Sequence, residues 1–228
     1  RMRKILIIGG SRGIGNALLN KLVDKNNVIN ISRVKPNLSH HNLTHHTCDI
    51  LTDELPDLNE LDSIIYSPGS INLKPISRLK LDDFRNDFEI NVIGAVKTIQ
   101  RYLPLLKKGN KPSIVLFSTV ATKLGMPFHA SVSAAKSAVE GLVKSLGAEF
   151  APTIRINAIA PTVTNTDLAS KILRNEKMID MITERHPLKK FLNPNEVADL
   201  AEFLLSEKSA SISGQVFNMD CGIVSFKI

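Results

Sequence analysis

Short aliphatic runs alternate with longer stretches that carry apolar residues at helical spacing, from one end of the chain to the other. The aliphatic runs predict strands at residues 5–8, 28–31, 63–66, 114–117, 154–159 and 216–219. The helical spacing predicts helices at residues 14–23, 82–103, 131–150 and 195–205, the last introduced by Pro194. This alternation is typical of an α/β fold in which helices cover both faces of a parallel sheet. Ligands of such sheets bind at the carboxyl ends of the strands.

Two connections between the predicted strands are short. Fifteen positions separate Arg33 from Cys48, which leaves little room for a full helix, and the stretch from Asp49 to Gly69 has room for a short one at best. The first connection contains four histidines, at positions 40, 41, 45 and 46. A zinc site is one interpretation, but the segment lacks the carboxylates or cysteines that usually accompany such histidines. We therefore favour a solvated loop and predict no metal.

The composition fits one globular domain spanning residues 1–228. Hydrophobic residues make up 43% of the chain and charged residues 22%, so one core can be buried. No apolar run approaches the ~18 residues that span a bilayer, and the N-terminus has no signal-peptide layout. We therefore expect a cytoplasmic protein without membrane contact. Cys48 and Cys221 lie far apart without a CxxC partner and are expected to be reduced.

The net charge of +7 favours an anionic partner. The basic residues are scattered, and aromatic residues make up only 5% of the chain. A nucleic-acid surface would need clustered cations with stacking rings nearby. We therefore expect phosphates on a cofactor, or an acidic substrate or carrier, and no nucleic acid.

A glycine-rich turn follows the first predicted strand and opens the first predicted helix. Gly9, Gly13 and Gly15 have the spacing G-x-x-x-G-x-G. A pyrophosphate needs this arrangement, because glycines let the backbone approach and the helix N–H groups face the anion. A tight turn without a ligand is the alternative. The candidate contacts are Gly9, Ser11, Arg12, Gly13, Ile14 and Gly15.

Several ordered segments resemble the short-chain dehydrogenase/reductase family over nearly the whole chain. They are CDI at 48–50, SPG at 67–69, EINVIGAV at 89–96, RINAIAPTVTNTD at 155–167 and the stretch 193–222. Thr162 and Cys221 stand where the family pattern has glycines. The resemblance implies a three-layer, doubly wound parallel sheet (a Rossmann fold) with about seven strands and helices on both faces. The further cofactor contacts that it implies are Asp49, Ile50, Ser67, Pro68, Gly69, Lys136, Pro161, Thr164 and Thr166.

The end of the second predicted strand indicates which dinucleotide is bound. NAD is preferred where an acidic residue there accepts the ribose 2′-hydroxyl, whereas NADP requires positive charge. Here the strand ends in Ser32 and Arg33, with no carboxylate before Asp49, and Arg12 adds a second cation. A guanidinium pairs well with a phosphate. We expect NADP(H), the alternative being that Arg33 is a solvated loop residue.

The catalytic residues of the family match this chain only in part. In the family a Ser orients the substrate oxygen, a Tyr protonates it, a Lys holds the ribose and a helix Asn positions a water. Lys136 and Asn91 match directly, and Thr119 stands at the Ser position, with Ser118 as a less favoured stand-in. Val132 occupies the Tyr position, four residues before Lys136, and an isopropyl group cannot donate a proton.

Other groups could deliver the missing proton. His129 lies seven residues before Lys136, on the same face if the helix begins that early, and histidine is a capable acid near neutral pH. The alternative is that His129 borders the helix and faces solvent. Ser133 is expected to pack, Ser131 to act as an N-cap, and a bound water remains a further donor. Tyr66, in a strand, and Tyr102, late in a long helix, are not expected to substitute.

These observations favour an NADPH-dependent reductase of a small carbonyl or α,β-unsaturated carbonyl substrate, with a proton donor other than Tyr. A non-catalytic NADP-binding sensor, or a silent subunit of a reductase complex, is the alternative. Residues 165–192 are expected to cover the substrate, and the resemblance implies a homodimer or homotetramer. The substrate could be linked to an acyl carrier, because basic residues gather in sequence near the expected substrate loops. These are Lys123, Lys171, Arg174, Lys177, Arg185, Lys189 and Lys190.

Overall fold

The computed structural model describes residues 1–227, and within them a seven-stranded parallel sheet forms the centre of the molecule. The strand order is β3-β2-β1-β4-β5-β6-β7. The strands are β1 (Lys4–Ile8), β2 (Asn27–Ser32), β3 (Leu43–Thr47), β4 (Ser63–Tyr66), β5 (Ser113–Phe117), β6 (Arg155–Pro161) and β7 (Val216–Met219). The order reverses between β1 and β4, which is where doubly wound sheets bind their ligands.

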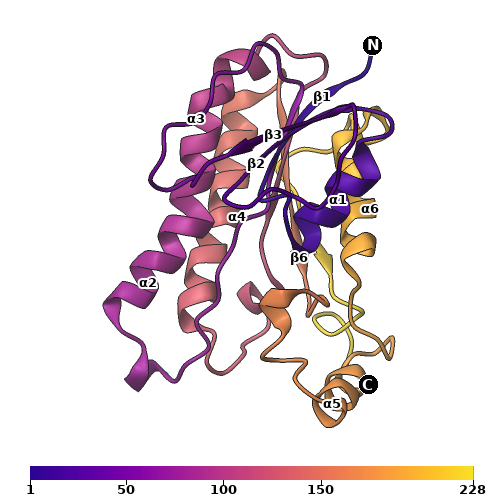
Figure 1. Ribbon diagram of the computed structural model, residues 1–228. Coiled ribbons are helices and arrows are strands. Elements are labelled where there is room, and N and C mark those ends of the chain that lie inside the picture. Colours follow the sequence, from indigo (N-terminus) through magenta and orange to yellow (C-terminus); the bar gives the residue numbers. More distant parts are fainter. Residues whose placement is uncertain (228) are drawn as a thin grey trace.

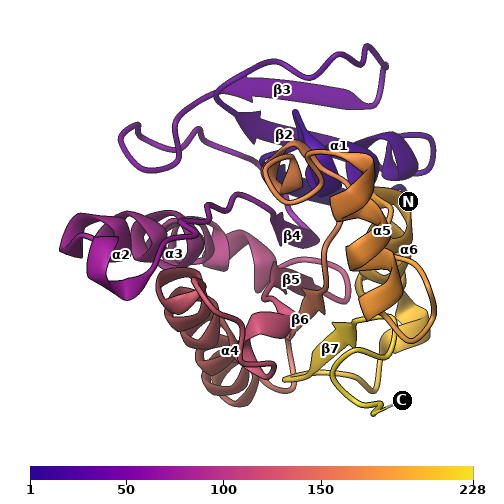
Figure 2. The ribbon, with the colours of Figure 1, turned by 90° about the horizontal axis from the view of Figure 1, so that it is seen from below.

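Helices cover both faces of this sheet (Figures 1 and 2). One face carries α1 (Gly13–Leu22) and α6 (Pro194–Leu205), and the other carries α2 (Leu81–Phe88), α3 (Gly94–Leu106) and α4 (Ala130–Phe150). The short helix α5 (Glu176–Arg185) lies at one end of the molecule, beyond the sheet (Figure 1). The central strands β4 and β5 are buried throughout, as expected when helices cover both faces. The predicted three-layer fold is therefore confirmed.

The structure corrects the interpretation of the histidine-rich connection. Residues 43–47 form the edge strand β3, which pairs in parallel with β2, so the connection is not simply a solvated loop. The next connection contains no helix between residues 50 and 62, although the sequence left room for a short one. The edge strand therefore completes the sheet without the helix that usually precedes or follows it.

The long helix predicted at residues 82–103 is interrupted. A π-helical turn at Glu89–Ile93 separates α2 from α3, and α3 continues to Leu106. Such turns insert an extra residue into a helix and often occur at functional sites. The other predicted helices are present with ends shifted by one residue at most. Among residues 1–227, no helix combines the length and the apolar character that crossing a bilayer requires.

Candidate active site

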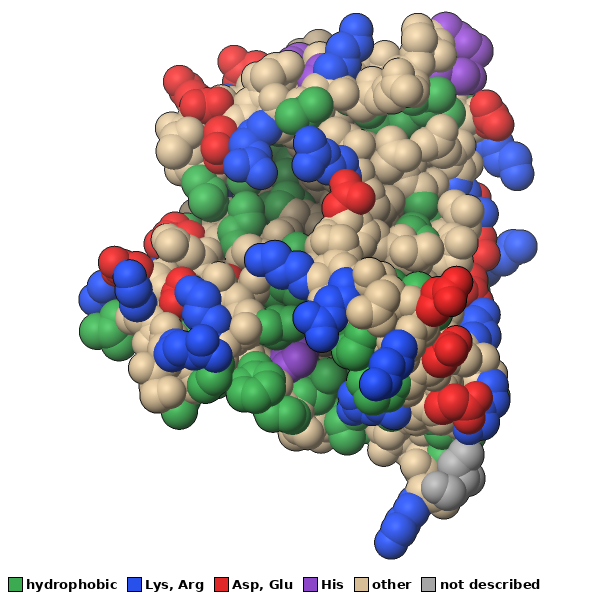
Figure 3. Space-filling view, turned by 60° about the horizontal axis from the view of Figure 1, so that its bottom comes forward, with side chains coloured by type: hydrophobic (Ala, Val, Ile, Leu, Met, Phe, Trp, Pro, Cys, Tyr) green, Lys and Arg blue, Asp and Glu red, His purple; other side chains and the backbone are tan. Residues whose placement is uncertain are grey.

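A cavity of about 540 Å³ opens at the carboxyl ends of the central strands. Its walls include Ile14 after β1, Gly69 after β4, Thr119 after β5 and Thr162 after β6. Most other lining side chains are apolar. In Figure 3, which brings this end of the molecule forward, hydrophobic side chains line a hollow and Lys and Arg side chains lie around it. The cavity is thus where the sequence placed a ligand site.

The glycine turn has the geometry that a closely approaching anion requires. Gly9 and Gly13 have φ values of +85° and +55°, which glycine adopts readily. A Cβ at Gly15 would collide with the carbonyl oxygen of Gly9 and with Ser67 Oγ, so only glycine lets α1 approach the turn. The first turn of α1 contains no acidic residue that would repel an anion. These features fit a dinucleotide pyrophosphate at the start of α1.

The end of β2 presents positive charge to solvent. Ser32 is buried, and its hydroxyl donates to the carbonyl of Val34 (2.7 Å) and accepts from Asn30 Nδ2 (2.9 Å). Arg33, by contrast, is exposed, as is Arg12 at the glycine turn. Within residues 1–227, neither guanidinium has a carboxylate within 4.0 Å. Both arginines therefore keep their full charge available for a ligand.

The next two predicted contacts differ in their surroundings. Asp49 is half-buried and accepts a hydrogen bond from the N–H of Leu51 (2.9 Å), which fixes its carboxylate. Ile50 is buried in the core. Ser67 donates to the carbonyl of Ile8 (2.8 Å) and so ties the turn after β4 to the end of β1.

Lys136 is held inside the site by the end of β5. Its Nζ donates to the carbonyl oxygen of Phe117 at 2.9 Å. Burial lowers the pKa of Lys136 to about 8, and the attraction of the Asp87 carboxylate offsets only part of this effect. The lysine is thus a poorly solvated cation that would gain from a polar or anionic ligand.

Asn91 lies beside Lys136 and has an oxygen without a partner. The π-helical turn carries this residue, which is 2% exposed, and its Nδ2 donates to the carbonyl of Asp87 (2.8 Å). Its Oδ1 is buried and accepts no hydrogen bond in the described part of the chain. A Cβ built on Gly69 would lie 3.2 Å from this oxygen and 3.7 Å from Lys136 Nζ. Both polar groups therefore approach the backbone of Gly69, and a ligand or water would satisfy the orphaned oxygen.

The hydroxyl of Thr119 points into the cavity and remains able to donate. Its Oγ1 accepts only the N–H of Ala121, at 3.3 Å. Ser118, the weaker candidate, is buried and donates to Glu140 Oε1 at 2.6 Å. The hydroxyl of Ser118 therefore binds α4, whereas that of Thr119 donates no hydrogen bond within the described residues and lines the cavity.

No phenol reaches the site in the described part of the chain. Val132, the residue that the resemblance puts at the tyrosine position, is 2% exposed and lines the cavity one turn before Lys136. Tyr66 donates to the carbonyl of Ile90 at 2.5 Å, and burial raises its pKa. Tyr102 donates to the carbonyl of Pro56 at 2.8 Å, and burial raises its pKa to about 12. Neither tyrosine lines the cavity.

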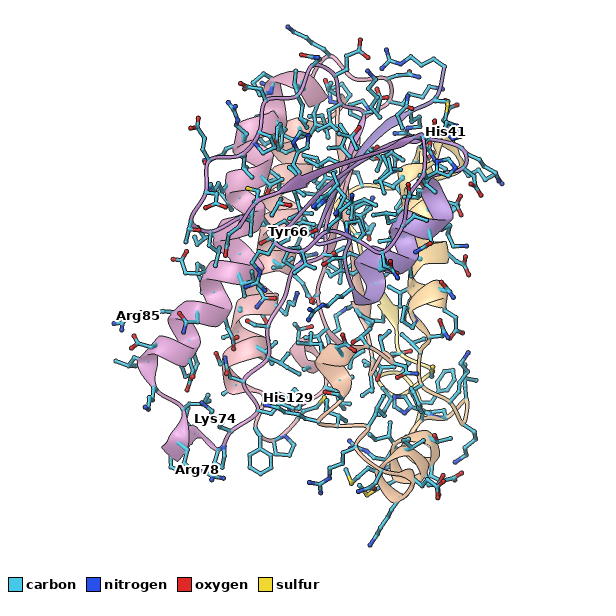
Figure 4. All side chains as sticks on the ribbon, viewed as in Figure 1. His41, Tyr66, Lys74, Arg78, Arg85 and His129 are labelled. Carbon is cyan, nitrogen blue, oxygen red and sulfur yellow. The ribbon has the colours of Figure 1, made fainter. Side chains whose placement is uncertain are left out.

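His129 lies at the boundary of α4 and lines the cavity. It precedes the first helical residue and makes no side-chain cap, but its Nδ1 lies 2.8 Å from the carbonyl of Pro127. In Figure 4 it lies at the same end of the molecule as the start of α4, far from His41. Since a carbonyl only accepts, Nδ1 carries the proton, and the neutral ring can only accept at Nε2. Donation from Nε2 therefore requires the imidazolium form.

The two serines that flank Val132 have structural partners. Ser131 was expected to be an N-cap, but it is buried inside the first turn and donates to Asp87 Oδ2 at 2.7 Å. The expectation was wrong because the helix begins one residue earlier, at Ala130. Ser133 donates to the carbonyl of Ala121 at 2.8 Å, which agrees with a packing role. Neither serine replaces the phenol.

The histidines of β3 and the preceding turn serve local contacts. His45 Nδ1 lies 2.9 Å from Asn30 Nδ2, and His40 Nε2 lies 3.4 Å from Asp24. Between residues 1 and 227, no group of three or more His, Cys, Asp or Glu side chains is arranged to hold a metal ion.

The sequence did not reveal one polar pair in the cavity wall. Thr162 Oγ1 lies 2.7 Å from His186 Nε2, and both residues are buried and line the cavity. His186 Nδ1 lies 2.7 Å from the carbonyl of Ile182. The substitution of glycine by Thr162 was visible in the sequence, but nothing there connected it with His186.

The segment expected to cover the substrate contributes much of the wall. The lining residues between positions 165 and 192 are Thr166, Leu168, Ala169, Lys171, Ile172, Met178, Met181, Ile182, Arg185 and His186. Pro161 and Thr164, two more of the expected cofactor contacts, line it from the end of β6. Of the basic residues considered for a carrier, only Lys171 and Arg185 belong to the described cavity wall.

Comparisons with known proteins show which family this chain resembles. Residues 39–224 match the family model described as enoyl-(acyl carrier protein) reductase. A tropinone reductase homolog of Arabidopsis thaliana is 30% identical over 96% of this chain and 78% of its own length. The 3-oxoacyl-(acyl-carrier-protein) reductase of Thermotoga maritima is 32% identical over 72% of this chain and 66% of its own length.

Solved structures share the fold over their whole length. ElxO with NADP bound has a TM-score of 0.89 and 27% identity, covering 99% of this chain and all of its own. Aldohexose dehydrogenase of Thermoplasma acidophilum has a TM-score of 0.90 at 24% identity, with 100% and 96% covered. The match to the family model, the glycine turn after β1 and the position of Lys136 beside Asn91 all indicate the same family. The chain belongs to the short-chain dehydrogenase/reductase family of oxidoreductases.

Proposed function

We propose that this protein is an NADPH-dependent reductase that transfers hydride to an apolar carbonyl or α,β-unsaturated carbonyl compound. The observation that carries the proposal is the juxtaposition of Lys136 Nζ and Asn91 Oδ1 at Gly69, beside a largely apolar cavity whose wall includes Gly69, Lys136 and Ile14 from the first turn of α1. A buried cation and an orphaned acceptor are costly to maintain without a ligand.

The cofactor would extend from β2 to α4. The glycine turn would receive the pyrophosphate, while Arg12 and Arg33 would bind the 2′-phosphate because both are exposed and lack carboxylate partners. Lys136 would donate to the ribose. The structural relatives include ElxO with NADP and 4-hydroxyisoleucine dehydrogenase with NADH, so the choice between dinucleotides rests on these arginines. Asp49, Ser67, Pro161, Thr164 and Thr166 would complete the contacts.

NADPH, when bound, supplies the hydride, and this chain's residues orient the acceptor and handle the proton. Thr119 would donate a hydrogen bond to the reacting oxygen. His129, in its imidazolium form, would be a proton donor at the mouth of the cavity. Because Val132 leaves no phenol there, an isolated ketone would lose roughly 10²–10⁴-fold in rate relative to a site with its acid in place. A conjugated substrate spreads the negative charge and depends less on an immediate proton, so we favour conjugate reduction.

The walls favour an apolar substrate with an anionic attachment. The cavity is lined by side chains such as Leu124, Met126 and Met181, while Lys171 and Arg185 supply positive charge. An acyl group carried on a phosphopantetheine thioester has both properties. The curated relative in Thermotoga maritima acts on an acyl-carrier-linked substrate, which supports this class.

Assembly would involve the face that carries α2 and α3. Leu81, Phe88 and Ile93 are large apolar side chains that are 72%, 42% and 39% exposed there. A second copy of the chain would cover them, so we propose a homo-oligomer, dimer or tetramer.

The test combines binding and turnover. Calorimetry with NADPH and NADH measures preference, and NADPH oxidation is followed with a cyclic enone, a simple ketone and acetoacetyl and crotonyl thioesters. We expect NADPH to bind at least 10-fold more tightly than NADH and the unsaturated substrates to react fastest. Binding without turnover of any substrate, unchanged by Thr119→Val and His129→Phe, would instead establish a non-catalytic NADP-binding protein, which the buried Val132 favours. Absence of binding to either dinucleotide would reject both.

A further inference from the structure

Thr162 and His186 form a hydrogen-bonded pair in the cavity wall, and the family pattern has no hydroxyl at the position of Thr162. Thr162 is 6% exposed and His186 is 2% exposed, yet both reach the cavity surface. Thr162 stands where the family pattern has glycine, so the chain has gained a hydroxyl at the end of β6. It has lost one at Val132, on the part of the wall formed by α4. Both changes affect the same cavity.

The sheet register brings Thr162 close to Thr119. Phe117 of β5 lies opposite Ile159 of β6, and the N–H of Ser118 donates to the carbonyl of Ile159 at 2.7 Å. Adjacent strands lie about 4.8 Å apart. Thr119 and Thr162 therefore follow the ends of neighbouring strands at the same edge of the sheet, and both line the cavity in which a substrate would lie.

The hydrogen bonds of His186 define two protonation states of the pair. The carbonyl of Ile182 only accepts, so Nδ1 carries a proton, and the neutral ring offers a lone pair at Nε2. Thr162 then donates its hydroxyl hydrogen to Nε2. In the imidazolium form Nε2 donates to Thr162 Oγ1 instead, which frees the hydroxyl hydrogen to point into the cavity. Protonation of a buried ring thus turns Thr162 from an acceptor into a donor toward the substrate.

We propose that Thr162 and His186 form a proton relay that replaces the tyrosine missing at Val132. This inference rests on the proposed reductase function, with NADPH as the hydride source. As hydride adds to the β-carbon, the C=C π electrons form a new double bond between the α-carbon and the carbonyl carbon, and the C=O π electrons move to oxygen, which forms a bond with the Thr162 hydroxyl hydrogen to give the enol. The Thr162 oxygen takes the Nε2 hydrogen of the imidazolium, and His186 ends as the neutral ring with its proton on Nδ1. Thr162 is the catalytic residue, and His186 supplies the proton through it.

Several charged or titratable groups surround the relay. Lys136 faces the cavity from α4, His129 from the residue before α4 and Lys171 from the segment before α5. Arg185 and Lys189 adjoin His186 on its own segment. From the turn after β7, Asp220 and Cys221 approach, since the carbonyl of Cys221 accepts the N–H of Leu188. The groups that line the cavity itself are cationic, so a pH effect must be assigned to His186 by direct observation of its ring.

Threonine variants test the relay by rate. Thr162→Val keeps the shape and removes the hydroxyl, and we expect it to lower the single-turnover rate of NADPH oxidation by at least ~10²-fold. NADPH affinity and KM should change only a few-fold, and Thr162→Ser should restore most of the rate. Thr98→Val is the matched control, because Thr98 is fully buried and donates to the carbonyl of Gly94 on α3, outside the cavity wall. It should keep the wild-type rate.

A measurement on the histidine ring separates a relay from a merely structural pair. Nitrogen-15 NMR of wild-type protein across a pH series should show two states of His186, a neutral ring with its proton on Nδ1 and a doubly protonated ring. The wild-type rate should fall over the pH range in which this ring loses its proton, and Thr162→Val should lose that dependence. The ring measurement needs no turnover and no variant, so it still decides if Thr162→Val does not fold.

The outcomes distinguish this inference from the reductase proposal. Wild-type turnover that Thr162→Val leaves intact overturns the relay and leaves the reductase standing. A ring that keeps one proton across the pH range, or a neutral ring protonated on Nε2, also overturns the relay alone. Failure of wild-type protein to oxidise NADPH with any substrate overturns both.

Discussion

Replacing Lys136 by methionine should make the protein more stable at neutral pH while abolishing its activity. The pKa of Lys136 is lowered from 10.5 to about 8 by burial, so the folded state disfavours the charged form. Each pH unit of such a difference corresponds to about 1.4 kcal/mol, which gives an upper limit of about 3 kcal/mol at pH 7. Loss of the hydrogen bond to the carbonyl of Phe117 offsets about 1 kcal/mol. We therefore expect a net gain of about 2 kcal/mol.

The gain has a defined pH dependence. Between about pH 8 and pH 10.5 the unfolded chain binds the proton and the folded chain does not, so wild-type stability rises with pH across this window. The burial penalty is fully present below about pH 8 and falls under about 1 kcal/mol near pH 10. The advantage of Lys136→Met should therefore shrink steadily over this range and vanish near its upper end.

Thermal denaturation of both proteins from about pH 6 to pH 10 measures this difference. A gain of about 2 kcal/mol corresponds to roughly 4–8 °C in Tm for a domain of this size. Lys144→Met is the matched control, because Lys144 is an exposed lysine of the same helix, and it should show no comparable gain. A Lys136→Met protein that is less stable at neutral pH, or whose advantage does not change with pH, would refute the idea that burial strains this lysine.

Three other substitutions probe the same site. Val132→Tyr in a Thr162→Val background should raise the rate of ketone reduction by ~10²-fold or more, since it places an acid one turn before Lys136 where the proposed relay has been removed; steady-state assays that show no gain would count against the absent phenol as the limiting feature. Arg33→Ala should weaken NADPH binding by roughly 10- to 100-fold and leave NADH binding unchanged, as measured by calorimetry. Equal losses of affinity for both dinucleotides would rule out a contact between Arg33 and the 2′-phosphate. Gly15→Ala should abolish cofactor binding and lower Tm, because its Cβ would collide with the carbonyl of Gly9; an unaffected variant would show that the turn can open.

Local patterns predicted most of the framework. The strands β1, β4, β5 and β6 are rich in consecutive aliphatic residues, which indicate strands buried on both faces. The helices between them have amphipathic spacing. Their order along the chain leaves few alternative topologies, because parallel strands need crossover connections. The fold therefore followed from segments that can each be interpreted alone.

The edge strand and the π-helical turn could not be predicted in this way. The sequence of β3, LTHHT, has two adjacent histidines and is partly exposed, and its strand conformation is stabilised by pairing with β2. Strand formation at an edge depends on the neighbour more than on propensity. The π turn at Asn91 inserts one residue into a helix whose apolar spacing continues on both sides, so periodicity alone gives no sign of it.

The site shows the same division between local and long-range information. The absence of a phenol at Val132 is visible from its spacing to Lys136, since both residues lie on one helix and the distance between them is fixed by the helical repeat. No such repeat fixes the distance between residues that come from different segments of the chain. Thr162 and His186 are separated by 24 positions and come from the end of β6 and the end of α5. Their 2.7 Å contact exists only once the sheet and the covering segment are in place, so the sequence predicted the spacing of residues on one helix, whereas a contact between two distant segments becomes visible only in three dimensions.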